Sequence, residues 1–230
     1  MKSLKKIMDG INAKEETDIS FCKVGNRARK LVVSFGGNGK PYFQRKSSLL
    51  LLRKERSDFD ILYLRNRANW YLGGLNGVGK NIEHTISFLR KQFSKYDKVI
   101  CTGNSAGGYA SILFGSLLSV DVVVADRPQI DLEYCVERME EDSIARNNLV
   151  KRKKECTATW NKYKKIDYIL NGETAYYVHF EGDANCRDEH DLILHGDYHY
   201  NLIKNFQSVK CIDSKDDVIP KINENLDTTR

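Results

Sequence analysis

A serine set among glycines, between a strand-like run and a helix-like run, is the feature that most constrains this chain. Residues 98–102 are apolar enough for a buried strand, and residues 109–114 continue as an apolar helix. Between them lies the segment Gly103-Asn104-Ser105-Ala106-Gly107-Gly108. Glycine permits tight turns and close backbone approach. The sequence therefore predicts a strand, a sharp turn with Ser105 at its apex, and a helix.

The spacing G-x-S-x-G in this context is typical of a nucleophile elbow. The apical serine of such a turn has a strained backbone, and the two flanking glycines remove side chains that would collide with the strand and the helix. Because the helix begins at the serine, its first N–H groups and the positive end of its dipole face any developing oxyanion. An ordinary strand-to-helix turn is the alternative.

Further strands and helices alternate along the chain. Apolar, β-branched runs predict strands at 31–35, 59–64, 120–125, 175–180 and 209–212, and helices are predicted at 47–54 and 81–96. This alternation predicts an α/β fold, with a mainly parallel sheet and helices on both faces. Functional groups should gather at the carboxyl ends of the strands. We expect one domain over residues 1–230, a lid-like helical insertion at 130–172 and a frayed tail at 223–230.

Composition indicates a water-soluble globular protein. Of its 230 residues 41% are hydrophobic and 30% charged, and the net charge of +6 is scattered. The one dense basic run, at 151–154, reads as a solvated helix face, with an anionic partner as the alternative. The longest apolar stretch, at 49–52, is too short for a membrane span. Six cysteines without a C-x-x-C pair favour a reduced, cytoplasmic protein.

The order of strand, Gly-Gly loop, strand, helix, strand, elbow and helix resembles the α/β-hydrolase superfamily. The resemblance covers residues 31–126 well and 175–213 loosely. It implies that Ser105 is the nucleophile and that the N–H of Ala106 is one oxyanion donor. The second donor would come from the loop Gly36-Gly37-Asn38, and Asn104 is a further candidate at the elbow.

The resemblance also implies an acid and then a histidine after the serine. Asp183 follows the strand at 175–180, where the family's acid usually lies, and Asp126 is a second candidate. Asp188 and Asp191 are weaker candidates. A carboxylate in this role would orient and stabilise the histidine.

The histidine departs from the family pattern. The family's base follows the last strand, but residues 213–220 contain no histidine. We expect His195 or His199 to serve in preference to His190, whereas His179 lies inside a strand and fits the core. The departure leaves three possibilities open, namely a relocated base, a dyad without the usual third member, or a catalytically inactive fold.

Two further segments could bind ligands. Residues 74–81 match the P-loop pattern G-x-x-x-x-G-K, but Asn81 replaces the hydroxyl residue that helps bind magnesium. Nucleotide binding is therefore the weaker interpretation, and a plain Gly-rich loop near the sheet edge is favoured. Arg65 and Trp70 follow a strand end, where an arginine and an aromatic face could hold a sugar or acyl group. A packed loop with solvated arginines is the alternative there.

The patterns together predict a serine-dependent ester hydrolase or acyltransferase that works through an acyl-enzyme. Its substrate would be an acylated carbohydrate or another small ester. We expect no cofactor, no metal and no nucleic-acid partner, and the oligomeric state is not predicted. The alternative is a catalytically inactive binding or scaffolding protein with the same fold.

Overall fold

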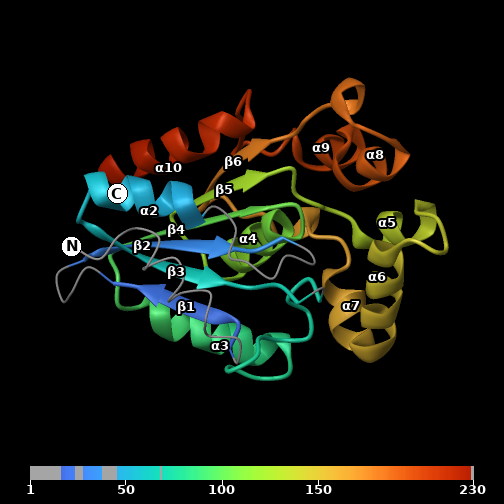
Figure 1. Cartoon of the computed structure of the whole chain (residues 1–230), viewed down its shortest axis with the longest axis horizontal. Coiled ribbons are helices and arrows are strands. Elements are labelled where there is room, and N and C mark those ends of the chain that lie inside the picture. The colour runs from blue at the N-terminus through green and yellow to red at the C-terminus, as the bar shows by residue number, and fades with distance from the viewer. Residues whose placement is uncertain (1–16, 24–27, 38–45, 68, 229–230) are drawn as a thin grey trace.

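The fold is built around one twisted sheet. The computed structural model describes residues 17–23, 28–37, 46–67 and 69–228 (Figure 1). Within these ranges seven strands pair in the order β1-β3-β2-β4-β5-β6-β7. Their bounds are β1 Ile19–Cys22, β2 Lys30–Phe35, β3 Phe59–Leu64, β4 Lys98–Asn104, β5 Val122–Asp126, β6 Ala175–His179 and β7 Val209–Cys211. All neighbours are parallel except β1, which pairs antiparallel with β3. The predicted α/β class with a mainly parallel sheet is confirmed.

Helices cover both faces of the sheet, as Figure 1 shows. Their bounds are α2 Lys46–Glu55, α3 Ile82–Phe93, α4 Ala106–Leu117, α5 Leu132–Arg138, α6 Ile144–Glu155, α7 Thr157–Tyr163, α8 Glu189–His195, α9 Asp197–Ile203 and α10 Val218–Asp227. Short 3₁₀ turns lie at Asp167–Ile169, Asp183–Asn185 and Lys215–Asp217.

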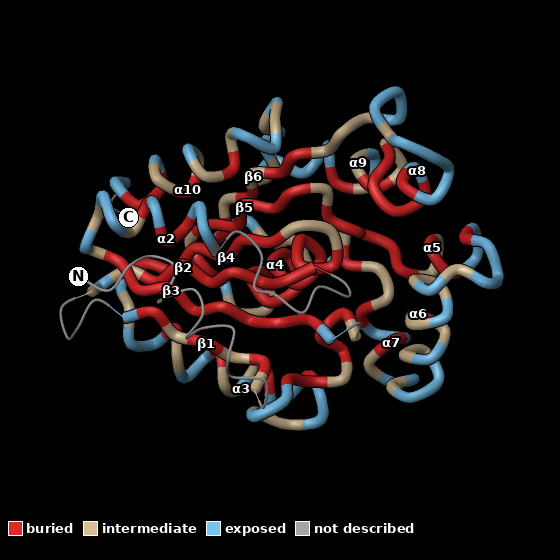
Figure 2. The backbone as a smooth tube through the Cα atoms, viewed as in Figure 1, coloured by how far each residue is buried: buried red, intermediate tan, exposed pale blue. Residues whose placement is uncertain are grey.

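The core consists of two hydrophobic clusters, one on each face of the sheet, because side chains alternate along each strand. In β2, Val33 and Phe35 join the cluster that packs against α3 and α4, whereas Val32 joins the cluster that packs against α2 and α10. Successive side chains of a strand point to opposite faces, so one strand supplies both clusters. Figure 2 shows the buried backbone running through the central strands and α4. The central strands are therefore covered on both faces, and their carboxyl ends are left to build a site.

The C-terminal tail differs from the sequence prediction. Residues 223–227, expected to be frayed, belong to α10. Val218, Ile222 and Leu226 are fully buried. Their spacing of four places them on one helical face, and that face packs against the sheet. Burial of this stripe explains why the segment is ordered.

The segment between β5 and β6 contains α5, α6 and α7, and it lies beyond the carboxyl ends of the strands (Figure 1). Glu133 ties these helices together, because its carboxylate accepts from Trp160 Nε1 at 2.9 Å and pairs with Lys153 and Lys164. A lid function for this insertion stays a prediction.

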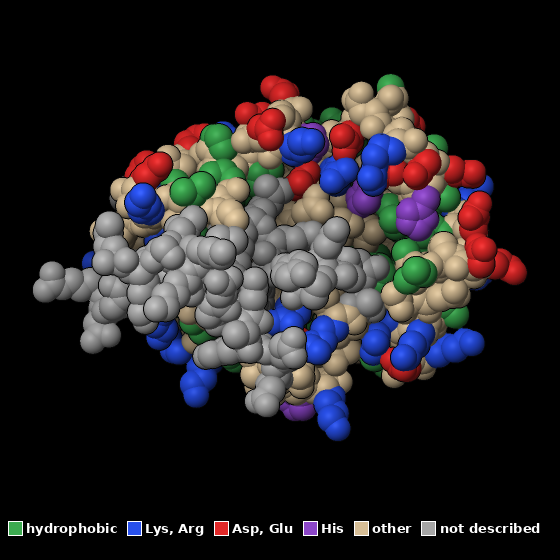
Figure 3. All heavy atoms as spheres, in the orientation of Figure 1, with side chains coloured by type: hydrophobic (Ala, Val, Ile, Leu, Met, Phe, Trp, Pro, Cys, Tyr) green, Lys and Arg blue, Asp and Glu red, His purple; other side chains and the backbone are tan. Residues whose placement is uncertain are grey.

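The basic run at 151–154 lies on α6. Arg152 pairs with Glu155 in the next turn, and Lys153 pairs with Glu133 of α5. Lys151 and Lys154 are exposed, and Figure 3 shows basic side chains on the visible surface in this region. Lys151 also pairs with Glu155, at 3.9 Å, so three of the four basic residues have acidic partners within the chain, which fits a solvated helix face.

The sequence also makes predictions about membrane spans and about the state of the cysteines. Every helix in the described ranges falls short of the length and apolarity that a bilayer span requires. All six cysteines are free thiols, and Cys22, Cys101 and Cys135 are buried.

Candidate active site

The elbow forms at the carboxyl end of β4. The strand ends at Asn104, Ser105 adopts φ 54° and ψ −120°, and α4 begins at Ala106. A non-glycine residue at positive φ is strained and persists only where the surroundings hold it. Here Ser105 N donates to the carbonyl of Asp126 at 2.9 Å, and Ser105 O accepts from Tyr109 N at 2.9 Å. The strain is therefore fixed from both sides by backbone hydrogen bonds.

Glycines flank the serine because there is no space for side chains. A Cβ on Gly103 would lie 2.2 Å from the carbonyl oxygen of Gly107. A Cβ on Gly107 would lie 2.2 Å from the carbonyl oxygen of Phe35, at the end of β2. Both distances are far below van der Waals contact, so the first turn of α4 can lie against the neighbouring strand end only with glycine at these positions.

A histidine and an aspartate complete a hydrogen-bonded chain from the serine. His195 Nε2 lies 2.9 Å from Ser105 Oγ, and His195 Nδ1 lies 2.9 Å from Asp191 Oδ1. Both residues belong to α8, one helical turn apart, and positions i and i+4 share a helix face. The side chains of His195 and Asp191 are 10% and 3% exposed, respectively.

Electrostatics favours a neutral imidazole beside an ionised carboxylate. Hydrogen bonds from Arg187, followed by that from His195, hold the pKa of Asp191 well below its usual range. Burial lowers the pKa of His195 below its usual 6.5, and Asp191 opposes this effect only in part. With Nδ1–H donated to Asp191, Nε2 of the neutral ring accepts from the Ser105 hydroxyl. This is the protonation state that a general base needs near neutral pH.

Comparison with known proteins gives structural matches only, since no family model and no curated protein matches the sequence. A Staphylococcus aureus protein of unknown function superposes with a TM-score of 0.57 at 14% identity, over 91% of this chain and 92% of the other. The capsule O-acetyltransferase of Neisseria meningitidis serogroup A gives 0.54 at 12% identity, over 92% and 89%. Esterase B from Lactobacillus rhamnosis gives 0.51 at 14% identity, over 91% and 83%. This chain has the α/β-hydrolase fold.

The histidine beside Ser105 does not lie where the resemblance to the α/β-hydrolase superfamily implies. His195 lies in α8, between β6 and β7, and not after the last strand. Of the arrangements that the sequence left open, the geometry corresponds to a histidine relocated along the chain.

Asp183, the favoured acid, lies elsewhere. Its Oδ1 accepts from the N–H of Asp197 at 2.7 Å, at the start of α9, while Asp191 occupies His195 Nδ1. The Asp183 carboxylate therefore accepts a backbone hydrogen bond at the start of α9, and Asp191 is the carboxylate in contact with His195. Asp188 caps α8 by accepting from the N–H of Asp191 at 2.8 Å.

His199, the other favoured base, is a buried structural residue. Its Nδ1 accepts from the N–H groups of Ile130 and Asp131 at 3.1 and 3.4 Å, and its Nε2 donates to the carbonyl of Ile193 at 3.0 Å. Burial lowers the pKa of His199 to about 4. Both ring nitrogens are thus engaged away from Ser105, and the ring joins α9 to the start of the insertion. His190 is exposed on α8.

A second histidine–aspartate pair lies next to the elbow and contacts the end of β4. His179 Nδ1 lies 2.8 Å from Asp126 Oδ1, and Asp126 Oδ2 accepts from Asn104 Nδ2 at 2.8 Å. The Asn104 side chain therefore reaches across to β5, which argues against the expected contact with substrate. Since the Asp126 carbonyl also accepts from Ser105 N, this residue anchors the turn through backbone and side chain together.

The predicted oxyanion loop is only partly available. The N–H of Gly36 donates to the carbonyl of Leu64 at 2.8 Å, so this group is committed to the backbone. Ala106 is the first residue of α4, where N–H groups have no partner within the helix. Ala106 and Gly37 stay predictions as oxyanion donors, and Asn38 lies outside the described residues.

The aromatic loop after β3 is packed inside the protein. Trp70 is fully buried, and its Nε1 donates to Gln129 Oε1 at 2.5 Å. The hydroxyl of Tyr71, also fully buried, lies 3.0 Å from the carbonyl of Gly36 and 3.1 Å from that of Leu64. Arg65 is buried as well. The expectation that Arg65 and Trp70 present faces to a substrate is therefore wrong, because these side chains brace the loops around the elbow.

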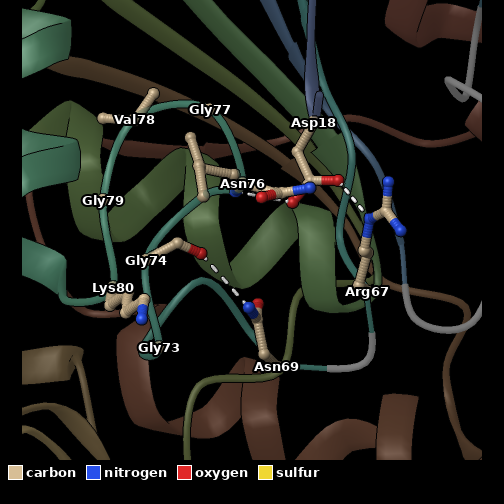
Figure 4. Close-up of a pocket in the computed structure, with 11 residues that line it drawn as sticks. Asp18, Arg67, Asn69, Gly73, Gly74, Asn76, Gly77, Val78, Gly79 and Lys80 are labelled. Carbon is tan, nitrogen blue, oxygen red and sulfur yellow. Dashed lines mark hydrogen bonds and ion pairs between the residues drawn. The ribbon is translucent and has the colours of Figure 1, made fainter. Parts of the chain in front are cut away.

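The Gly-rich loop lines a cavity of about 470 Å³, drawn in Figure 4. Several of its backbone N–H groups donate hydrogen bonds to other groups of the protein. Leu75 N donates to the carbonyl of Gly79, and the N–H groups of Val78 and Gly79 both donate to the carbonyl of Leu75. Asn76 N donates to the carboxylate of Asp18 at 2.9 Å. A P-loop binds phosphate with free backbone N–H groups, so these internal hydrogen bonds argue against that function.

We expect Gly107→Ala to destabilise the fold, because its methyl group would meet the Phe35 carbonyl. Overpacking of this kind costs about 1–3 kcal/mol. Gly172→Ala is the matched control, since nothing lies within 4 Å of a Cβ there. Urea unfolding of the two variants measures the difference. Equal stability would contradict the close approach of α4 to the end of β2.

Proposed function

We propose that the protein is a serine-dependent ester hydrolase that acts through an acyl-enzyme. One observation carries the proposal, namely the continuous hydrogen-bonded chain from Ser105 Oγ through His195 to Asp191, with 2.9 Å at each step. The strained backbone of Ser105 supports it, because strain of this kind clusters at functional sites.

The proposed reaction has two halves. Ser105 Oγ attacks the ester carbonyl carbon while His195 Nε2 takes the hydroxyl proton. The tetrahedral intermediate collapses, His195 returns the proton to the leaving alcohol, and the acyl group stays on Ser105. A water then attacks the acyl-enzyme with His195 again as base, and the carboxylic acid leaves. Asp191 holds the Nδ1–H tautomer and stabilises the imidazolium, and Ala106 N–H is the proposed oxyanion donor.

An acylated carbohydrate or another small ester is the proposed substrate. The buried Trp70 and Arg65 no longer support a sugar-binding face, so the carbohydrate proposal rests on likeness to a capsule O-acetyltransferase over 92% of this chain. That likeness also raises acyl transfer to a sugar hydroxyl as a second candidate function. The two differ only in which group resolves the acyl-enzyme. Mass analysis of products from 4-nitrophenyl acetate, with and without an oligosaccharide, distinguishes acetate release from acetyl-sugar formation.

Ser105→Ala should abolish covalent labelling by a fluorophosphonate probe, since only an activated serine reacts. Ser94→Ala, at an exposed serine in the cap of α3, should leave labelling unchanged. Intact-protein mass spectrometry measures the adduct. If wild-type protein is unlabelled while folded, the inactive binding or scaffolding alternative replaces the enzyme.

Asp191→Asn should lower kcat by about 10²–10⁴, because the amide cannot hold the imidazole tautomer or stabilise the imidazolium. The matched control is Asp183→Asn, which keeps an acceptor for the N–H of Asp197. Steady-state kinetics on 4-nitrophenyl acetate compares them. A larger loss in Asp183→Asn than in Asp191→Asn would restore Asp183 as the acid.

The acid limb of kcat/KM against pH should have its midpoint below 6.5, because burial lowers the pKa of His195 from that value. Activity requires the neutral ring, so it persists above the lowered pKa and falls as the pH drops through it. The profile is measured with an ester whose leaving group does not titrate in this range. A midpoint above 6.5 would mean that another group controls the limb.

A further inference from the structure

Arg187 encloses the carboxylate that orients the histidine. It lies just before α8, and its Nε is 3.0 Å from Asp191 Oδ2 while its Nη2 is 3.3 Å from Asp191 Oδ1. The backbone N–H of Arg187 also donates to Asp191 Oδ2, at 3.3 Å. With His195 Nδ1 on Oδ1, this carboxylate accepts four hydrogen bonds, three of them from Arg187.

The arginine connects a buried site to the surface. The Asp191 side chain is 3% exposed, whereas that of Arg187 is 78% exposed. The Nε and Nη2 groups of a guanidinium match the two oxygens of a carboxylate, so this contact fixes the plane of the carboxylate as well as its position. Asp191 Oδ1 contacts both Arg187 Nη2 and His195 Nδ1. The positive charge of the guanidinium partly neutralises the carboxylate that faces the histidine.

We propose that Arg187 is a positioning residue for the acid–base pair: it fixes the Asp191 carboxylate in the orientation that holds His195, and it limits how strongly that carboxylate stabilises the imidazolium. The inference rests on the proposed function for its kinetic consequences. Its geometric part concerns His195 and Asp191 alone.

Two opposite effects follow from removing the guanidinium. Without the two guanidinium contacts from Arg187, the Asp191 carboxylate rotates more freely. The fraction of protein with a well-oriented His195 imidazole then falls. Without its charge, Asp191 stabilises the imidazolium more strongly, so the pKa of His195 rises. A purely structural residue would produce the first effect only.

Other charges face His195 and are unchanged by substitution at Arg187. From the end of β5, Arg127 lowers the pKa of His195 and Asp126 raises it. Arg127 in turn pairs with Glu181 at 2.7 Å. On α9 the neighbouring His199 is held neutral by burial. A shift on mutating Arg187 is therefore assigned to the contact with Asp191.

The kinetic test compares three variants. In Arg187→Gln the acid-limb midpoint of kcat/KM should move to higher pH, and plateau kcat should fall about two- to five-fold, the range of an exposed ion pair. Arg187→Lys keeps the charge and loses the fork, so kcat falls with little movement of the midpoint. Lys204→Gln, which removes an exposed charge after α9, should change neither.

A double-mutant cycle tests whether Arg187 acts through Asp191. In the Asp191→Asn background, Arg187→Gln should produce no further shift of the midpoint, because the charge it modulates is gone. An equal shift in both backgrounds would overturn the inference, as would an unmoved midpoint in active Arg187→Gln protein.

An NMR titration of the His195 ring separates this inference from the proposed function. It is read in wild type and in Arg187→Gln, and it needs no activity. A higher midpoint in the variant supports the role of Arg187 even if the protein proves inactive. An unmoved midpoint in a variant with the wild-type Tm overturns it, whatever the activity.

Discussion

The close approach of the first turn of α4 to the end of β2 is the constraint on which the rest of this site depends. Gly107 lies against the Phe35 carbonyl with no space for a Cβ, and Gly103 lies equally close to Gly107. This contact brings the start of α4 directly beside the Gly36–Gly37 loop. The apical serine is then held at positive φ, and its hydroxyl lies 2.9 Å from His195 Nε2. Close packing of the α4 backbone against the end of β2 thus determines the geometry of the site.

Strain gathers around this contact. Of the five non-glycine residues at positive φ in the described ranges, Trp70, Tyr71, Ser105 and Arg127 follow carboxyl ends of strands, and Ser119 follows α4. Each is held by a defined hydrogen bond, including Trp70 Nε1 to Gln129 and Arg127 N to the His179 carbonyl. Because unfavourable dihedrals of this kind persist only where surroundings over-determine them, the sheet edge is rigidly built. A rigid edge suits a site that must hold a serine and an imidazole within hydrogen-bond distance.

Much of the fold was predictable because each central strand is apolar on both faces, and such runs stand out between glycines and charged residues. β1 was missed because its alternating burial over four residues gives a weak signal. In the site, the glycines on either side of Ser105 identify the serine. The family order points to Asp183, whereas the local geometry points to Asp191. The spacing Asp191-x-x-x-His195 was the available signal, since it places both side chains on one helix face. The prediction that Trp70 faces a substrate is wrong because the burial of an aromatic side chain in a loop depends on tertiary contacts. The sequence does not display those contacts.

Asp191 and His195 lie on the same helix, so they keep their positions relative to one another. Their separation is set by the helical turn of α8, whereas their distance to Ser105 depends on how α8 sits on the sheet. That seating depends on α9, since His199 accepts from Ile130 and Asp131 at the start of the insertion. Tyr198 adds a hydrogen bond to Asp131 at 3.0 Å and stacks on Tyr134 of α5. The insertion therefore contacts α9 and, through it, α8, so displacement of the insertion would move His195 relative to Ser105 while leaving its contact with Asp191 intact.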